Sequence, residues 1–172
     1  MKGKFPIFIP KTNQERVQNL VKEFSEWVSC RYHWEVTEKA DGASMTVYLK
    51  DNDFGVCSRN LELKYDDINI YCRIALRDRM KDILLDYGRN IALQGELIGA
   101  GINGNLYRMM DNKFLLFDIF DIDRGVYFDS VERNAFADRY GIWHVSCIDK
   151  EYVFSGADID FVLNYAEGGI YY

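Results

Sequence analysis

Short segments in which apolar and polar residues alternate, each closed by a turn signal, constrain the fold of this chain most. Residues 34–39 (WEVTEK) and 43–50 (ASMTVYLK) alternate in this way, and an Asp-Gly pair lies between them. Period-two alternation predicts strands, and Asp-Gly between two strands is a turn signal. The polar residues 51–53 predict a second turn, after which residues 54–58 return as a third strand. Strands joined by such short turns predict an antiparallel sheet.

Two more apolar segments, residues 91–99 and 113–122, also predict strands. The sequence GAGINGN at 99–105 connects them and predicts a flexible, Gly-rich link. The final residues, EGGIYY, predict a turn that leads into one more strand.

Apolar residues at helical spacing predict helices between and beyond these strands. The first covers residues 13–29 and starts at a capping-box pattern, TNQE. The second covers residues 67–87, with Gly88 as its C-cap. Two shorter helices are predicted at residues 130–140 and 157–166.

Composition and length limit the fold class. Hydrophobic residues make up 48% of the 172 positions and prolines number only two, which is typical of a folded protein. This length fits one domain of residues 1–172. The predicted elements make it an α+β domain with a sheet rich in antiparallel pairs.

The formal net charge of -6 excludes a global basic field that would attract nucleic acid. A polyanionic partner would have to bind a local patch, or a region that this chain lacks. The four cysteines are scattered without zinc-type spacing, and no apolar run is long enough for a membrane span. We therefore expect a cytoplasmic protein with reduced cysteines.

Lys39, in the sequence EKADG, is the first candidate for chemistry. A lysine amine must lose its proton before it can attack, and the neighbouring acids Glu38 and Asp41 favour the protonated form. In a strand Glu38 would face away from Lys39, and Gly42 would permit a backbone conformation closed to other residues. The residues alone leave both readings open: a nucleophile or a solvated surface lysine.

Four later residues are candidates for nucleotide binding, each beside an ordinary structural role. Arg59 could fork onto a phosphate or ribose, or pair with Glu62. Glu96 follows a glycine in an apolar strand, where a carboxylate needs a ribose, a metal or an ion pair. Phe117 could stack on a base or belong to the core. Glu167, before Gly-Gly, could bind a metal or close a turn.

The order of these motifs carries a resemblance that none carries alone. K-x-D-G is followed by S-R-N with its arginine 20 positions after the lysine, then by G-E in a strand, F-D-I and E-G-G. This series resembles the covalent nucleotidyltransferase superfamily of polynucleotide ligases and mRNA capping enzymes. EKADGAS, GVCSRN and LQGELIGAGINGN are most similar to ATP-dependent RNA ligases of the nick-sealing branch. The resemblance implies an antiparallel-sheet nucleotidyltransferase fold, an ATP-grasp-like ligase core with peripheral helices.

The resemblance also implies a reaction. Lys39 would attack the α-phosphorus of ATP, release pyrophosphate and form lysyl-AMP, with Mg²⁺ or Mn²⁺ as the metal. The AMP would pass to an RNA 5′-phosphate, and a 3′-hydroxyl at an RNA end or nick would then displace it.

Site roles are implied by position in the motifs. Glu38 would contact the adenine edge, and Ala40 would line the same nucleotide site. Arg59 would grip ribose or phosphate, and Glu96 would bind the ribose hydroxyls. Phe117 would stack on adenine, and Glu167 would help to hold the metal.

Two departures from the family pattern matter. The family has a further motif with paired lysines after E-G-G, and usually a C-terminal domain that engages RNA; both are absent from this sequence. We therefore expect a chain cut after E-G-G, in which nucleotide binding survives better than catalysis, and which needs the missing domain or a partner for sealing. The alternatives are a DNA ligase or capping-type enzyme, or a non-catalytic nucleotide-binding remnant.

Overall fold

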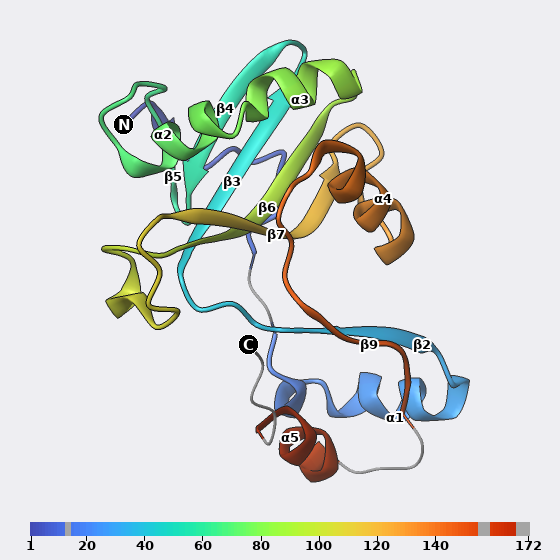
Figure 1. Cartoon of the computed structure of the whole chain (residues 1–172). Coiled ribbons are helices and arrows are strands. Elements are labelled where there is room, and N and C mark those ends of the chain that lie inside the picture. The colour runs from blue at the N-terminus through green and yellow to red at the C-terminus, as the bar shows by residue number, and fades with distance from the viewer. Residues whose placement is uncertain (13–14, 155–158, 168–172) are drawn as a thin grey trace. The chain divides into compact units, whose positions relative to one another are not determined.

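The computed structural model describes residues 1–12, 15–154 and 159–167, with side chains as far as Tyr165. Its elements are shown in Figure 1. The chain divides into two compact units. Unit 1 consists of Met1–Thr12 and Lys39–Val145, and unit 2 of Asn13–Glu38 and Ser146–Tyr172.

Unit 1 is built on one seven-stranded sheet in which every named strand pair is antiparallel. In spatial order its strands are β1 (Gly3–Lys4), β5 (Leu61–Leu63), β4 (Asp53–Ser58), β3 (Ala43–Lys50), β6 (Ile91–Ile98), β7 (Lys113–Asp121) and β8 (Val126–Tyr127). The sheet confirms the predicted α+β class and the strands predicted at 43–50, 54–58, 91–99 and 113–122.

The centre of the sheet is β3, which pairs with β4 on one side and with β6 on the other. A two-residue turn joins β3 to β4, because Lys50 pairs directly with Asp53. Its two residues, Asp51 and Asn52, have positive φ values of 51° and 66°. Asp and Asn tolerate this conformation better than most residues, so the turn follows from local chemistry.

Helices α2 (Ile70–Arg77), α3 (Met80–Tyr87) and α4 (Ser130–Tyr140) belong to unit 1. They cover one face of the sheet (Figure 1). Alternate residues of β3, such as Met45 and Val47, are buried under them. Tyr48 points to the opposite face, where it packs with Phe5 of the N-terminal segment. The period-two pattern of β3 therefore assigns one set of side chains to each face.

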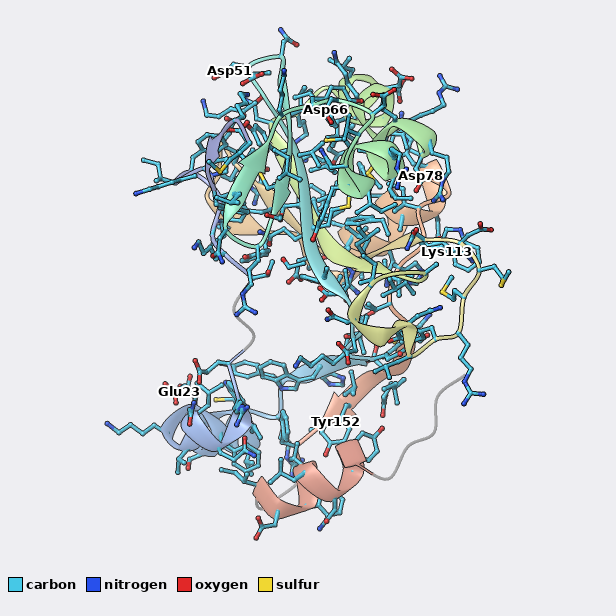
Figure 2. All side chains as sticks on the ribbon, turned by 90° about the vertical axis from the view of Figure 1, so that its left-hand side faces the viewer. Glu23, Asp51, Asp66, Asp78, Lys113 and Tyr152 are labelled. Carbon is cyan, nitrogen blue, oxygen red and sulfur yellow. The ribbon has the colours of Figure 1, made fainter. Side chains whose placement is uncertain are left out.

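Unit 2 contains a second, two-stranded sheet formed by β2 (His33–Thr37) and β9 (Cys147–Val153). Its helices are α1 (Val21–Cys30) and α5 (Ile159–Glu167). Aromatic rings fill the space between them: Trp34 lies 4.8 Å from Trp27 and 5.7 Å from Phe154 between ring centroids. Figure 2 shows the side chains of this cluster, including Tyr152.

The predicted hairpin across the Asp-Gly turn is wrong. β2 does not pair with β3; it pairs antiparallel with β9, more than 100 residues later, with His33 opposite Val153. Alternation identifies a strand but does not identify its partner, because any strand with one apolar face satisfies the same pattern. The Asp-Gly pair instead lies in a connection between the two sheets.

The helix predicted at 13–29 starts later than expected. A short 3₁₀ turn, η1 (Val17–Asn19), precedes α1, and Leu20 between them has non-helical angles of φ −109° and ψ 36°. The hydroxyl of Thr12, expected to cap the helix, lies 3.1 Å from the hydroxyl of Ser44.

The helix predicted at 67–87 is two helices, because Arg79 has a φ of 52° and interrupts the chain. Gly88 caps α3 as predicted, with a φ of 72°. The predicted helices at 130–140 and 157–166 are confirmed as α4 and α5. The predicted C-terminal strand lies outside the described residues.

Candidate active site

Lys39 lies in the connection that runs from β2 to β3, with its side chain exposed. Residues 38–42 form no strand. The prediction that Lys39 ends a strand in which Glu38 faces the opposite side is therefore wrong. The connection is nevertheless fixed from the Gly42 side, because Ala43 is already the first residue of β3 and pairs with Leu97 of β6. The lysine therefore lies four residues before the start of a buried central strand.

Gly42 is required by space and does not need an unusual backbone. Its φ lies outside the left-handed region, contrary to the prediction. A Cβ atom at this position would lie 2.3 Å from the carbonyl oxygen of Leu97 and 2.8 Å from Cγ2 of Ile98. The glycine of K-x-D-G lets the connection pass directly against β6.

Glu96 lies on β6, opposite Ser44, and its carboxylate accepts a hydrogen bond from the backbone N–H of Gly42. Burial raises the pKa of Glu96, and the Gly42 hydrogen bond opposes this shift. Among nearby charges, Asp41 raises the pKa further, whereas Lys39 and Arg59 lower it. Charged groups of two other motifs, K-x-D-G and S-R-N, therefore act on the half-buried carboxyl group of Glu96.

Arg59 directly follows β4, whose last residue Ser58 pairs with Met45 near the start of β3. The alternative role of Arg59 was an ion pair with Glu62. The Glu62 carboxylate instead lies 2.8 Å from the Lys2 amine. Glu62 also accepts a hydrogen bond of 2.6 Å from the Tyr48 hydroxyl. The positive charge of Arg59 lowers the pKa of Glu96.

Phe117 is the extra residue of a β-bulge in β7. Gln94 of β6 pairs with Asp118 and Gly95 pairs with Leu116, so Phe117 has no partner in the ladder. Leu116 and Ile119 both face the helix-covered core. Phe117 and Asp118 between them are consequently turned to the other face, which carries Glu96. The half-buried Phe117 ring is thus available on the face where a base could stack.

The remaining predicted residues are placed less completely. Ala40 is half-buried in the Lys39 connection. Glu38 belongs to unit 2, where its backbone N–H bonds to the carbonyl oxygen of Ser146 at 2.9 Å. Glu167 ends α5, but its side chain lies outside the described part of the structure.

Two residues that sequence reasoning missed bind the Lys39 connection. The backbone N–H of Asp41 donates to the hydroxyl of Tyr107 at 3.2 Å. The side-chain amide of Asn103 donates to the carbonyl oxygen of Gly42 and, at 3.4 Å, to the carboxylate of Asp41. The Asn-Gly pair in GINGN signals a turn, but no local pattern indicates that the turn would reach residue 41.

No group of three or more His, Cys, Asp or Glu side chains that could hold a metal occurs within the described residues. This does not conflict with a Mg²⁺ requirement, since Mg²⁺ uses one or two carboxylates together with phosphate oxygens. Burial is the main reason for the raised pKa of Glu96, and the negative charge of Asp41 raises it further. Within residues 1–12, 15–154 and 159–167, no helix is long and apolar enough to cross a membrane.

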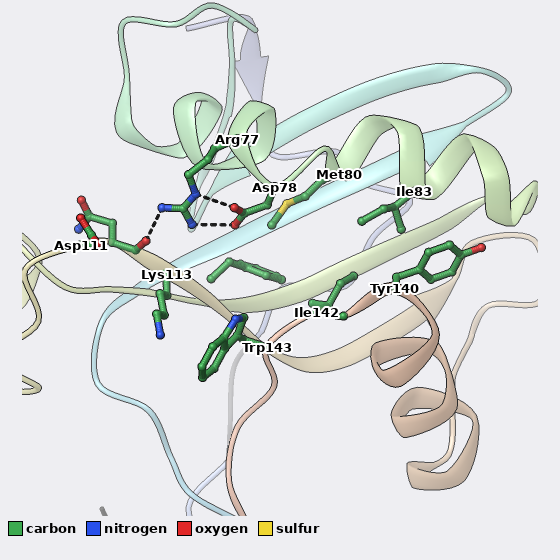
Figure 3. Close-up of a pocket in the computed structure, with 12 residues that line it drawn as sticks. Arg77, Asp78, Met80, Ile83, Asp111, Lys113, Tyr140, Ile142 and Trp143 are labelled. Atoms are coloured by element: carbon green, nitrogen blue, oxygen red, sulfur yellow. Dashed lines mark hydrogen bonds and ion pairs between the residues drawn. The ribbon is translucent and has the colours of Figure 1, made fainter.

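A separate pocket of about 280 Å³ lies on the helix-covered side of unit 1 (Figure 3). Arg77 lines it and binds Asp78, and Trp143 lies at its edge with the Lys113 amine 3.6 Å from the ring centroid. None of the residues predicted for the nucleotide lines this pocket. We therefore build the candidate site on the charged cluster around Glu96.

Comparison with known proteins gives this cluster a family. The sequence profile of the RNA ligase family matches residues 32–168. A variant of the RNA ligase of Naegleria gruberi, solved with ATP and Mn, is 40% identical and superposes with a TM-score of 0.88 over 94% of this chain. A second variant, solved with AMP and Mn, is 42% identical, with a TM-score of 0.82 over 88% of this chain.

The chain spans about half the length of these relatives, 48% of the first and 47% of the second. The comparison with curated proteins gave no match. Profile, sequence identity and superposition agree over most of the sequence, and together they show that the chain belongs to the RNA ligase family.

Proposed function

We propose that this chain is the adenylyltransferase domain of an ATP-dependent RNA ligase, with Lys39 as the nucleophile. The observation that carries the proposal is the close approach of the Lys39 connection to β6, where a Cβ atom at Gly42 would lie 3.0 Å from Cγ of Glu96. The charges of Asp41, Lys39 and Arg59 act on the half-buried carboxyl group of that residue. The Naegleria gruberi relatives, which have been solved with ATP or AMP and with Mn, support the choice of nucleotide.

The first step is an in-line displacement at phosphorus. The neutral amine of Lys39 attacks the α-phosphorus of ATP, and an N–P bond forms as the bond to the bridging oxygen of the β-phosphate breaks. Pyrophosphate leaves with the electron pair, and the amine loses its remaining excess proton to solvent. Phosphoryl transfer depends mainly on positioning and charge stabilisation. Charged groups at the ends of the central strands would supply both.

Each residue of the cluster has a proposed role in binding the nucleotide. Glu96 binds the ribose hydroxyls, because a half-buried carboxylate with a raised pKa gains from hydrogen-bond donors. Arg59 binds ribose or phosphate from the end of β4. Phe117 stacks on adenine from the bulge in β7, while Glu38 and Ala40 meet the adenine edge from the connection.

A divalent cation would be held mainly by phosphate oxygens, since Mg²⁺ takes only one or two carboxylates beside them. When bound, Mg²⁺ or Mn²⁺ would neutralise charge on the phosphate oxygens. Glu167 is the proposed protein ligand.

The second and third steps transfer AMP to an RNA 5′-phosphate and seal it to a 3′-hydroxyl. RNA ends or a nicked duplex are the proposed substrates, in RNA repair in the cytoplasm. We assign residues 1–172 to one adenylation domain, which acts with the further lysine motif and the C-terminal domain of the family, either in one protein or as a partner.

Labelling with ATP tests the proposal. The purified chain is incubated with α-labelled ATP and Mg²⁺ or Mn²⁺, denatured, and assayed for acid-labile label on protein. The variant Lys39→Ala should lose the label, whereas Lys50→Ala should keep it, since Lys50 pairs with Asp51 at the far end of β3. GTP, NAD, and nicked RNA against nicked DNA separate the RNA ligase from its DNA ligase and capping-type alternatives.

Absence of label on the wild-type chain would reject an autonomous adenylyltransferase. Calorimetry with ATP then distinguishes two cases. Binding without label supports a nucleotide-binding domain that needs the lysine motif in trans, and adding a separate C-terminal segment should restore labelling. Neither label nor binding would reject the functional assignment of this chain.

A further inference from the structure

The loop between β6 and β7 has a tightly specified conformation. Its left-handed positions are Gly99, Gly101, Asn103, Gly104, Asn105 and Arg108. Non-glycine residues adopt this conformation only at a cost, so the loop must be held by specific contacts.

The side chain of Asn105 fastens the loop to itself. Its amide donates to the carbonyl oxygen of Met109 at 2.9 Å, and its oxygen accepts from the N–H of Met109 at 3.0 Å. At the base of the loop, the amide of Asn112 donates to the carbonyl oxygen of Ala100 at 2.8 Å. These contacts explain how the loop keeps its shape, but they do not explain the direction of Asn103 and Tyr107.

Asn103 and Tyr107 both reach out of the loop to the main chain beside Lys39. The Tyr107 hydroxyl accepts the N–H of Asp41, and the Asn103 amide donates to the carbonyl oxygen of Gly42 and to the Asp41 carboxylate. Three groups of the Asp-Gly pair are therefore bound by one loop, and the first of them belongs to the peptide bond that follows Ala40.

We propose that Asn103 and Tyr107 are positioning residues for the Lys39 nucleophile. This inference rests on the proposed function of Lys39. The two side chains fix the peptide groups of Asp41 and Gly42, so that the Gly42 N–H faces the Glu96 carboxylate and the lysine is presented in one direction.

Asn103 has a second effect through the Asp41 carboxylate. The charges of Asp41, Lys39 and Arg59 all act on the carboxyl group of Glu96. A hydrogen bond from Asn103 holds the Asp41 carboxylate on the loop side. Without this bond the Asp41 side chain is no longer fixed to the loop.

The alternative is that Asn103 only serves the shape of the loop, because it has a φ of 38°. Glycine adopts left-handed angles freely, and aspartate tolerates them nearly as well as asparagine. A shape role therefore predicts that Asn103→Gly and Asn103→Asp work and Asn103→Ala fails. The positioning role predicts that all three fail, with Asn103→Asp worst, because a carboxylate cannot donate and repels Asp41.

Single-turnover formation of lysyl-AMP, measured over a range of ATP concentrations, distinguishes the shape role from the positioning role. We expect Asn103→Gly to lower the rate at saturating ATP by roughly 10- to 100-fold, the scale of a small misplacement of a reacting group. The ATP concentration at half-saturation should change little. Tyr107→Phe, which removes the acceptor for Asp41, should lower the same rate, whereas the matched control Tyr127→Phe on β8 should not.

A second measurement does not need ATP. Trace acylation followed by mass spectrometry gives the reactivity of Lys39 relative to Lys50 in the same molecule. We expect the ratio to fall in Asn103→Gly and Tyr107→Phe, and to stay unchanged in Tyr127→Phe.

The outcomes separate the two proposals. A wild-type rate and an unchanged ratio in Asn103→Gly would overturn the positioning role, even if Lys39 is the nucleophile. If the wild-type chain forms no lysyl-AMP, it is not an autonomous adenylyltransferase, and the acylation ratio still decides whether the loop controls the lysine. If the Asn103 variants do not fold, Tyr107→Phe decides, since it retains the ring and removes one oxygen atom.

Discussion

Only a residue without a side chain fits at position 42, between the Lys39 connection and β6. A Cβ atom at Gly42 would lie 2.3 Å from the carbonyl oxygen of Leu97. The K-x-D-G pattern predicts a glycine with an unusual backbone, and the structure gives the glycine a different reason. The identity of the residue could be predicted from the motif. Its cause could not, because it depends on Leu97 of β6, 55 positions later in the sequence.

Replacement of this glycine should therefore be costly. We expect Gly42→Ala to lower the free energy of unfolding by about 1–3 kcal/mol, the usual effect of overpacking, and to reduce lysyl-AMP formation. Urea denaturation and the labelling assay measure the two effects. Gly3→Ala is the matched control, since nothing lies within 4 Å of a Cβ atom at Gly3 and its φ is not left-handed. Equal stability of the two variants would contradict the close approach.

We expect the charge of Glu96 to support nucleotide binding and to lower the free energy of unfolding at neutral pH. Its pKa is raised in the folded protein, so its contribution to stability is fully present below the unfolded pKa and is lost as pH rises through the folded pKa. Glu96→Gln keeps an acceptor for Gly42 and removes the charge. We expect this variant to be more stable than wild type at neutral pH, and the difference to vanish in acid.

Thermal denaturation at several pH values checks the Glu96 expectation, and calorimetry should show weaker ATP binding for the same variant. A stability difference that grows as pH falls would contradict the raised pKa.

Among the elements, β7 shows most clearly what alternation reveals and what it hides. Its existence follows from the apolar run at 113–122, but the bulge at Phe117 is invisible to a period-two pattern. The bulge arises where Gly95 lets the Leu115 carbonyl and the Phe114 ring approach β6, since a Cβ atom at Gly95 would lie 2.4 Å from that oxygen. Which phenylalanine faces the core could be decided only after this register shift was known.

The two faces of β7 predict opposite effects of the same substitution. Phe114→Leu should destabilise the fold with little direct effect on nucleotide affinity, because Phe114 is 2% exposed in the main core. Phe117→Leu should leave stability nearly unchanged and weaken ATP binding by about 1–3 kcal/mol, the scale of base–aromatic stacking. Denaturation and calorimetry on both variants test this, and a reversed pattern would place Phe117 in the core.

The β3–β4 hairpin gives a third test at this scale. Asn52 has a φ of 66°, so Asn52→Ala should cost about 1 kcal/mol or more of unfolding free energy, whereas Asn52→Gly should not. Urea denaturation measures both, and an Ala variant as stable as the Gly variant would contradict the left-handed turn.

Across the whole molecule, the sequence predicted the α+β class and most element positions, because these depend on local periodicity and turn residues. The separate sheet of unit 2 was not predictable, because β2 and β9 find each other across a sequence separation that leaves no local trace. For the same reason the motif residues could be named individually, while the contacts of Asn103 and Tyr107 with the Lys39 connection could not.

Net charge gives a prediction at this scale. With 27 acidic and 21 Lys and Arg side chains, the chain neutralises few phosphates of an RNA duplex. We expect its affinity for nicked RNA to fall by less than about tenfold between about 50 and 200 mM salt, a much weaker dependence than that of proteins with many phosphate contacts. Filter binding over this range tests it, and a steep dependence would reveal a concentrated basic patch.

The interleaving of the two units also sets an order of events during synthesis. The strands of unit 1 are complete once residue 127 has left the ribosome, whereas β2 waits for β9, at residues 147–153. Because a nascent chain emerges from its N-terminus, the seven-stranded sheet can form while the strand that leads into Lys39 is still unpaired. The peptide just before the lysine is therefore expected to reach its final partner among the last steps of folding.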